Sequence, residues 1–194
     1  LLRRVSAEQP FLLIASFVNP HDICYLAIRD SMADDQERRL IENGKTEISV
    51  LNRALEIPQD VDEETFLMER CPPLPINPLP LEDEPAAVQE TLERRPFRAI
   101  VREKWTEKEW RMHRWAYGRL TEMVDAQIGR VLQALRQSGL ENNTVVIFTS
   151  DHGYHLGEHD FWAKVSLRDE SAGVPLIISV PGKKPAVCDS FTEL

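Results

Sequence analysis

The stretch TVVIFTSDHGYHLGEHDFWAKVSLRDESAGVPLIISVP, residues 144–181, decides the fold. It opens with an apolar run at 145–148 that has no alternating polar residue, a pattern typical of a strand buried on both faces of a parallel sheet. A second apolar run at 174–180 closes the unit, and an earlier run at 11–17 has the same character. The sequence therefore predicts an α/β fold: a mainly parallel central sheet, with strands at 11–17, 144–149 and 174–180, flanked by helices.

Polar side chains follow two of these runs, at the point where each strand should end. Asp151 and His152 come directly after the run at 145–148, and Gly153 should let the backbone turn tightly behind them. His21 follows the run at 11–17 in the same way. Because ligands bind at the carboxyl edge of open α/β sheets, a carboxylate and an imidazole placed there predict a metal or anion site.

The clearest helical signal lies before the quoted stretch. Thr106 and Glu109 have the spacing of a capping box, and apolar residues recur at intervals of three and four between 116 and 135. This pattern predicts one long amphipathic helix. Residues 33–41 and 48–55 are predicted to form two shorter helices.

A proline-rich and acidic segment interrupts the chain between residues 58 and 96. It holds eight of the thirteen prolines, and between 59 and 96 there are ten acidic residues against three arginines, most of the net charge of −9. Proline lacks a backbone N–H donor and has a fixed φ angle, so this many prolines exclude regular helix or central strand. The segment is expected to run over the surface of the domain in an extended conformation. We interpret 58–96 as an insertion within one domain that spans residues 1–194.

Composition restricts the class of protein. The apolar and charged fractions are those of an ordinary globular domain, and no apolar run reaches the ~20 residues of a membrane span. The acidic balance argues against nucleic-acid binding. Cys24, Cys71 and Cys188 are widely spaced, which fits neither a disulfide framework nor a zinc cluster, and they receive no role. The chain begins at Leu1, without an apolar targeting core and without an initiator Met, so we read it as a piece of a larger protein.

Four linked signatures in the quoted stretch resemble the type I sulfatases, members of the alkaline-phosphatase-like superfamily. They are SDHG at 150–153, LGEH at 156–159, WAK at 162–164 and VPLI at 174–177. Pro20-His21 also resembles a Pro-His pair of this family, although the family usually has a proline two residues after the histidine, where this chain has Ile23. The likeness covers about residues 10–25 and 110–182.

The resemblance implies a site and a reaction. Asp151 would be a calcium ligand and His152 a second metal-site residue, Lys164 would bind the sulfate oxygens, and His21 would lie near the leaving group. Carboxylate oxygens suit calcium, whereas an imidazole is a poorer match, so zinc or manganese are alternatives. The substrate would be a sulfated small molecule or carbohydrate, and an exported parent protein (periplasmic, extracellular or lysosomal) is implied.

The family's nucleophile is a formylglycine made from Cys or Ser in a Cys/Ser-x-Pro-Ser/Ala-Arg motif. Cys71-Pro72-Pro73 matches only its start, because Leu74-Pro75 replaces the rest, and it follows the His21 run instead of preceding it. Asp34-Asp35 does not match the family's aspartate pair either, because no apolar run precedes it. We therefore expect the nucleophile in a missing N-terminal half of the domain, and the isolated chain should be inactive.

Two other functions remain open at this stage. A phosphoesterase or phosphonate hydrolase of the same superfamily would keep Asp151 and His152 but would hold zinc or manganese. A non-catalytic remnant would bind an anion or a partner protein without turnover.

Overall fold

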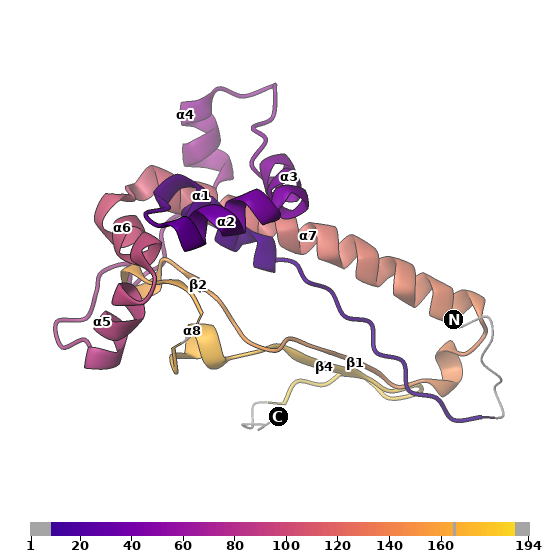
Figure 1. Ribbon diagram of the computed structural model, residues 1–194. Helices are drawn as coiled ribbons and strands as arrows, with labels where there is room; N and C mark the ends of the chain where they lie inside the picture. Colours follow the sequence, from indigo (N-terminus) through magenta and orange to yellow (C-terminus); the bar gives the residue numbers. More distant parts are fainter. Residues whose placement is uncertain (1–8, 165, 189–194) are drawn as a thin grey trace.

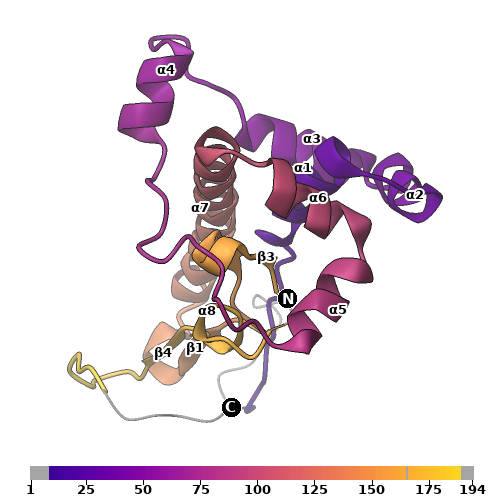
Figure 2. The same ribbon diagram turned by 90° about the vertical axis from the view of Figure 1, so that its left-hand side faces the viewer.

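The computed structural model of the protein describes residues 9–164 and 166–188. One long helix, α7 (Glu107–Gln137), runs across the molecule; most other helices gather on its N-terminal half, and a small sheet lies beside its C-terminal half (Figure 1). Figure 2 views the same arrangement from the end where α5, α6 and the short strand β3 approach one another. The fold is thus mixed α/β, but helices supply most of its mass.

The capping box predicted for α7 is present. The Thr106 backbone N–H donates to Glu109 Oε2 at 2.8 Å, and the Thr106 hydroxyl oxygen accepts from the N–H of Lys108. These bonds satisfy donors that the first turn leaves free. The two shorter predicted helices are also present, as α2 (Asp35–Asn43) and α3 (Lys45–Ala54).

The remaining elements are short. The other helices are η2 (His21–Ile23), α1 (Cys24–Ser31), α4 (Glu63–Thr65), η3 (Phe66–Arg70), α5 (Ala86–Glu93), α6 (Pro96–Lys104), η4 (Glu141–Asn143), η5 (Glu158–Asp160) and α8 (Asp169–Ala172). The strands are β1 (Val146–Thr149), β2 (His155–Leu156), β3 (Trp162–Ala163) and β4 (Leu176–Ser179). None of the helices in the described part of the chain is long and apolar enough to cross a membrane.

The core lies where α1 meets α7, and it has two parts. One joins α1 to α6, α7 and β3 through Ala27, Phe97, Trp110 and Trp162. The other joins η2 and α1 to α3 and α7 through buried apolar residues: Ile23, Leu26, Leu51, Ala54, Ala116 and Leu120. Helix α1 sits in both parts, so it anchors the loop before it, which carries His21, to the centre of the molecule.

The prediction of a mainly parallel sheet with three buried strands is wrong for the described residues. β1 pairs with β4 in antiparallel register, with Ile147 opposite Ile178, and residues 9–18 form no strand. Both strands expose their apolar side chains: Ile147 is 62% and Ile178 is 55% exposed. An apolar run shows that a strand is suited to burial, but the direction of pairing depends on the connection, and parallel neighbours need a crossover. Here the connection folds into the small sheet of β2 and β3.

The prediction that 58–96 excludes regular helix is also wrong. Helices α4 and α5 and the π-helical turn η3 lie inside this segment. The prolines avoid these helices: they cluster at 72–80, which is extended as expected, and Pro85 stands at the N-cap of α5. A proline directly before a helix removes no helical hydrogen bond. The number of prolines in 58–96 therefore did not show how much helix the segment could form.

Polar contacts fasten this segment to the rest of the chain. The guanidinium of Arg102 donates to both carboxylate oxygens of Glu84, at 2.8 and 2.7 Å, and lies 3.5 Å from Asp160. The side chains of Asn77 and His159 meet at 3.1 Å. The proline-rich segment therefore packs against the loop that leads to Lys164.

Candidate active site

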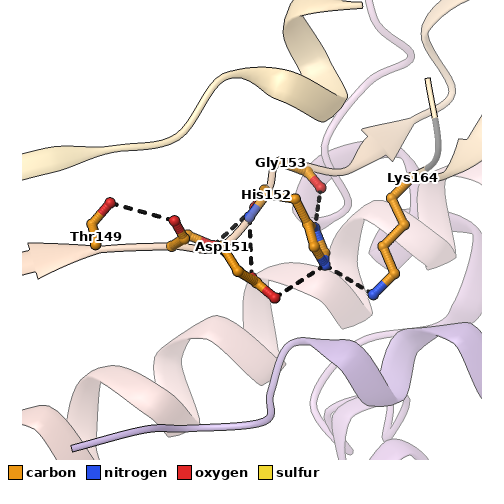
Figure 3. A network of polar contacts seen from close by, with 6 residues as sticks. Thr149, Asp151, His152, Gly153 and Lys164 are labelled. Carbon is orange, nitrogen blue, oxygen red and sulfur yellow. Dashed lines mark hydrogen bonds and ion pairs between the residues drawn. The ribbon is translucent and has the colours of Figure 1, made fainter. Parts of the chain in front are cut away.

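Three of the four predicted site residues are in direct contact. The Lys164 Nζ lies 2.9 Å from His152 Nε2, and that nitrogen lies 3.5 Å from Asp151 Oδ2 (Figure 3). Because an ammonium group can only donate, Nε2 accepts, and the imidazole proton is on Nδ1, which donates to the Gly153 carbonyl at 2.7 Å. The ring is therefore held from both sides.

A short hairpin brings Lys164 back to His152. Strands β2 and β3 pair antiparallel with His155 opposite Ala163, so the residue that follows Ala163 lies beside the residues that precede His155. Ala163 adopts φ = 72°, a left-handed conformation that costs a non-glycine residue about 1–3 kcal/mol and that occurs preferentially at functional sites. The hairpin must hold this strained residue in place.

The buried pair of Trp162 and His113 secures the hairpin to α7. The indole N–H of Trp162 donates to His113 Nε2 at 3.0 Å, and His113 is fully buried. Burial lowers the pKa of His113 to about 3, so the imidazole is neutral and remains an acceptor at physiological pH. This contact fixes β3 directly before Lys164.

Gly153 has a different role from the predicted tight turn. A Cβ atom there would lie 2.2 Å from the Glu170 carbonyl oxygen and 2.7 Å from that of Gly173, closer than real contacts allow. Its N–H donates to the Ser171 carbonyl at 2.8 Å. A glycine is needed here because the backbone around α8 approaches closely, and this approach positions His152.

Asp151 is the exposed member of the cluster, with 85% of its side chain accessible. Desolvation acts to raise the pKa of Asp151, but the neighbouring His152 and backbone N–H donors outweigh it and hold the pKa below its usual value. The carboxylate is therefore ionised and accessible to a cation.

His21 lines a cavity of about 240 Å³ together with Lys164, the member of the cluster that reaches this cavity. Burial lowers the pKa of His21, the positive charge of Lys164 lowers it further, and Asp22 opposes both. The structure thus brings all four predicted residues to one place, with His21 on η2, Asp151 and His152 after β1, and Lys164 after β3.

The described residues do not form a complete metal site. Across residues 9–164 and 166–188, no group of three or more His, Cys, Asp or Glu side chains could hold an ion. Calcium takes about six to eight oxygen ligands, so one carboxylate and one imidazole do not form a complete site. Asp151 and His152 are two side chains that can ligate a cation, and any further donors would have to come from outside the described residues.

The other ionisable residues of the loop stabilise its shape. Glu158 lies 3.4 Å from Arg114 of α7 and accepts from the N–H of Leu156 at 2.6 Å. Burial acts to raise the pKa of Asp160, against the pull of the nearby Arg102. These contacts hold the path of the loop from β2 to β3 and explain its charge without a catalytic role.

Two cysteine thiols are unsuited to act as nucleophiles. Burial raises the pKa of Cys24 to about 12, and burial raises the pKa of Cys71 to about 11. Since the thiolate is the reactive form, both are inert at neutral pH. For Cys71 this agrees with its poor match to the nucleophile motif.

Sequence reasoning missed three residues that line the same cavity: Arg95, Arg98 and Tyr154. Arg95 was assigned to the extended segment, and Arg98 lies in α6, which the sequence analysis did not predict. A cluster of three arginines around Pro96, in the stretch RRPFR at 94–98, was the available signal.

A mixed α/β protein that gathers an ammonium, two imidazoles and a carboxylate beside one cavity is equipped to bind an anion. The comparison with known proteins identifies the class further: the family model described as Sulfatase matches residues 1–193. The chain therefore belongs to the sulfatase family, the type I sulfatases of the alkaline-phosphatase-like superfamily.

Individual relatives agree with this assignment. Human iduronate 2-sulfatase is 43% identical over 81 residues, which are 42% of this chain and 15% of that protein. The delta 4,5-hexuronate-2-O-sulfatase of Bacteroides thetaiotaomicron is 29% identical over 182 residues, 91% of this chain and 31% of that protein. A solved 2-O GAG sulfatase superposes with a TM-score of 0.66 at 26% identity, covering 94% of this chain and 33% of the other. This chain spans about a third of the length of its longest-matching relatives.

Proposed function

We propose that this chain carries the sulfate-binding part of a sulfatase active centre and two ligands of its metal site. The parent protein would hydrolyse sulfate monoesters of sugars. The observation that carries the proposal is the contact of Lys164 with His152, which in turn neighbours Asp151, beside the cavity that Lys164 shares with His21. The names of the iduronate and hexuronate sulfatases support a sulfated sugar as the substrate.

The residues suit the charge changes of the reaction. Negative charge builds on the leaving oxygen when a sulfate monoester is cleaved, and Lys164 would stabilise the sulfate oxygens through this change. Burial and Lys164 both lower the pKa of His21, which favours the neutral ring in the free protein. An arriving anion would favour the protonated ring, which could then pass a proton to the leaving oxygen.

Asp151 and His152 would bind a divalent cation, calcium by resemblance to the family, together with ligands outside this chain. Bound there, the cation would neutralise part of the sulfate charge. To accept it, His152 would have to exchange its contact with Lys164, which would free the ammonium for the substrate.

The nucleophile is the component that these 194 residues do not match, since Cys71-Pro72-Pro73 has only the start of the nucleophile motif. We propose that a formylglycine in the remaining part of the parent protein supplies it.

A generic aryl sulfate tests the proposal. The full-length parent, produced with the formylglycine-generating machinery, should release the phenol, and the 194-residue chain alone should not. Turnover by the isolated chain would show that it has its own nucleophile. A full-length protein that cleaves an aryl phosphonate monoester but not the sulfate would overturn the proposed reaction.

A further inference from the structure

Two arginines, Arg95 and Arg98, line the cavity in addition to Lys164. Arg95 is the N-cap residue of α6 and Arg98 lies in its first turn; both line the same cavity as His21 and Lys164. The cavity therefore has positive charge from two separate sources, the lysine after β3 and the arginines of α6.

Neither guanidinium has a carboxylate partner among the described residues. Arg98 makes one long hydrogen bond, from Nη1 to the Thr91 carbonyl at 3.4 Å, and its Nε is buried with no partner. The neighbouring Arg94 and Arg102, in contrast, pair with Glu90 at 2.5 Å and Glu84 at 2.7 Å. Arg98 also lies over the Phe97 ring, with its Cζ 5.9 Å from the ring centroid, so the two cavity arginines lie near each other without a carboxylate between them.

The two like charges are placed unfavourably. Burial lowers the pKa of Arg98 below its ordinary value, and the like charge of Arg95 lowers it further. A partly buried charge without a partner is destabilising unless an opposite charge compensates it. No acidic side chain among the described residues lines the cavity to compensate it.

A third group points to the same ligand. The hydroxyl of Tyr154 is buried and has no hydrogen-bond partner. The ring is held by Tyr117 and Trp162, at centroid distances of 5.5 and 6.1 Å, so the hydroxyl cannot easily turn away to water. An unpaired donor beside an unpaired guanidinium is suited to a carboxylate, which accepts several hydrogen bonds at once.

We propose that Arg95, Arg98 and Tyr154 form a second anion subsite that binds the carboxylate of a sulfated uronic acid, while Lys164 and His21 bind its sulfate. This inference rests on the proposed sulfatase function and specifies its substrate. The cavity of about 240 Å³ lies below the ~300–1,000 Å³ of sites for drug-sized ligands, which favours one sugar ring bearing both groups.

A matched pair of substrates tests the subsite in the full-length protein. One is a sulfated uronic acid, and the other is the same sulfated sugar with its carboxylate reduced to an alcohol. The wild type should prefer the acid, and Arg98→Gln should lower the ratio of the two kcat/KM values by about 10- to 100-fold, mainly through the KM of the acid. Arg95→Gln should act in the same direction and is the safer variant for folding, because its guanidinium makes no polar contact in the described structure. Arg94→Gln, on the exposed surface, is the control.

The outcomes separate the two proposals when binding of the unsulfated uronic acid is measured by calorimetry as well. The subsite would be overturned if the wild type turned over both sulfates without preferring the acid. It would also be overturned if the ratio of the two kcat/KM values were unchanged in both arginine variants. Either result would leave the sulfatase function standing. The wild type could instead bind the unsulfated acid, with weaker binding in Arg98→Gln and Arg95→Gln, yet turn over neither sulfate. This result would support the subsite and overturn the sulfatase function. Loss of turnover for both substrates alike, with the ratio unchanged, would also contradict the subsite.

Discussion

Replacing Lys164 with Met should lower kcat/KM of the full-length protein for a sulfate ester by about 10²–10³-fold, the loss typical of removing one donor from a charge-stabilising site. Methionine keeps much of the length of the side chain and removes only the charge and the donors. The hairpin should be retained, because its pairing and the contact of Trp162 with His113 do not involve residue 164.

The control for this prediction is Lys183→Met, because Lys183 is an exposed lysine in the turn after β4. It should keep full activity. An Lys164→Met enzyme within a factor of about three of wild type, with an unchanged melting temperature, would show that the ammonium does not contact the reacting sulfate.

Asp151→Ala should remove bound metal from the full-length protein and lower its activity by more than about 100-fold, since even residues that only support metal ligands typically cost 10- to 100-fold. Asp151 is 85% exposed, so the substitution should leave the stability of the apoprotein nearly unchanged. Metal content per protein, measured by mass spectrometry after dialysis, together with calcium calorimetry, gives the readout.

The control is Asp35→Ala, because Asp35 is an aspartate away from the cluster whose side chain is 88% exposed on α2. Its metal content should equal that of wild type. If Asp151→Ala keeps its metal and its activity, Asp151 is not a ligand, and the anion site would have to work without it.

The residues of the candidate site could be selected from the sequence because they occur in short motifs of specific chemistry. The four signatures between 150 and 177 pointed to Asp151, His152 and Lys164, and the structure brings these side chains into contact. Their mutual distances could not be predicted, since they depend on the antiparallel pairing of His155 with Ala163. Two-residue strands such as β2 and β3 are too short to show a periodicity.

The arrangement of the strands was predicted less well than the helices. Helix α7 has a cap and a long apolar stripe, both local signals, and it forms as expected. The partners and direction of β1 and β4 depend on contacts far apart in the chain, which an apolar run does not encode. The same limit hid Arg98, which reaches the cavity only because α6 packs against α1.

The central claim is that His21 and Lys164 bind the same sulfate ion, and NMR titration of the five histidine rings tests it most directly. In the free protein, burial and Lys164 hold the pKa of His21 below its ordinary value of 6.5. A sulfate between the two groups favours the imidazolium, so sulfate should raise the pKa of His21, and by linkage sulfate should bind more tightly as the pH falls through that range. The account predicts that this rise disappears in Lys164→Met, while the buried His113 does not respond in either protein. A His21 pKa that stays unchanged while sulfate binds, or that rises equally without Lys164, would contradict it.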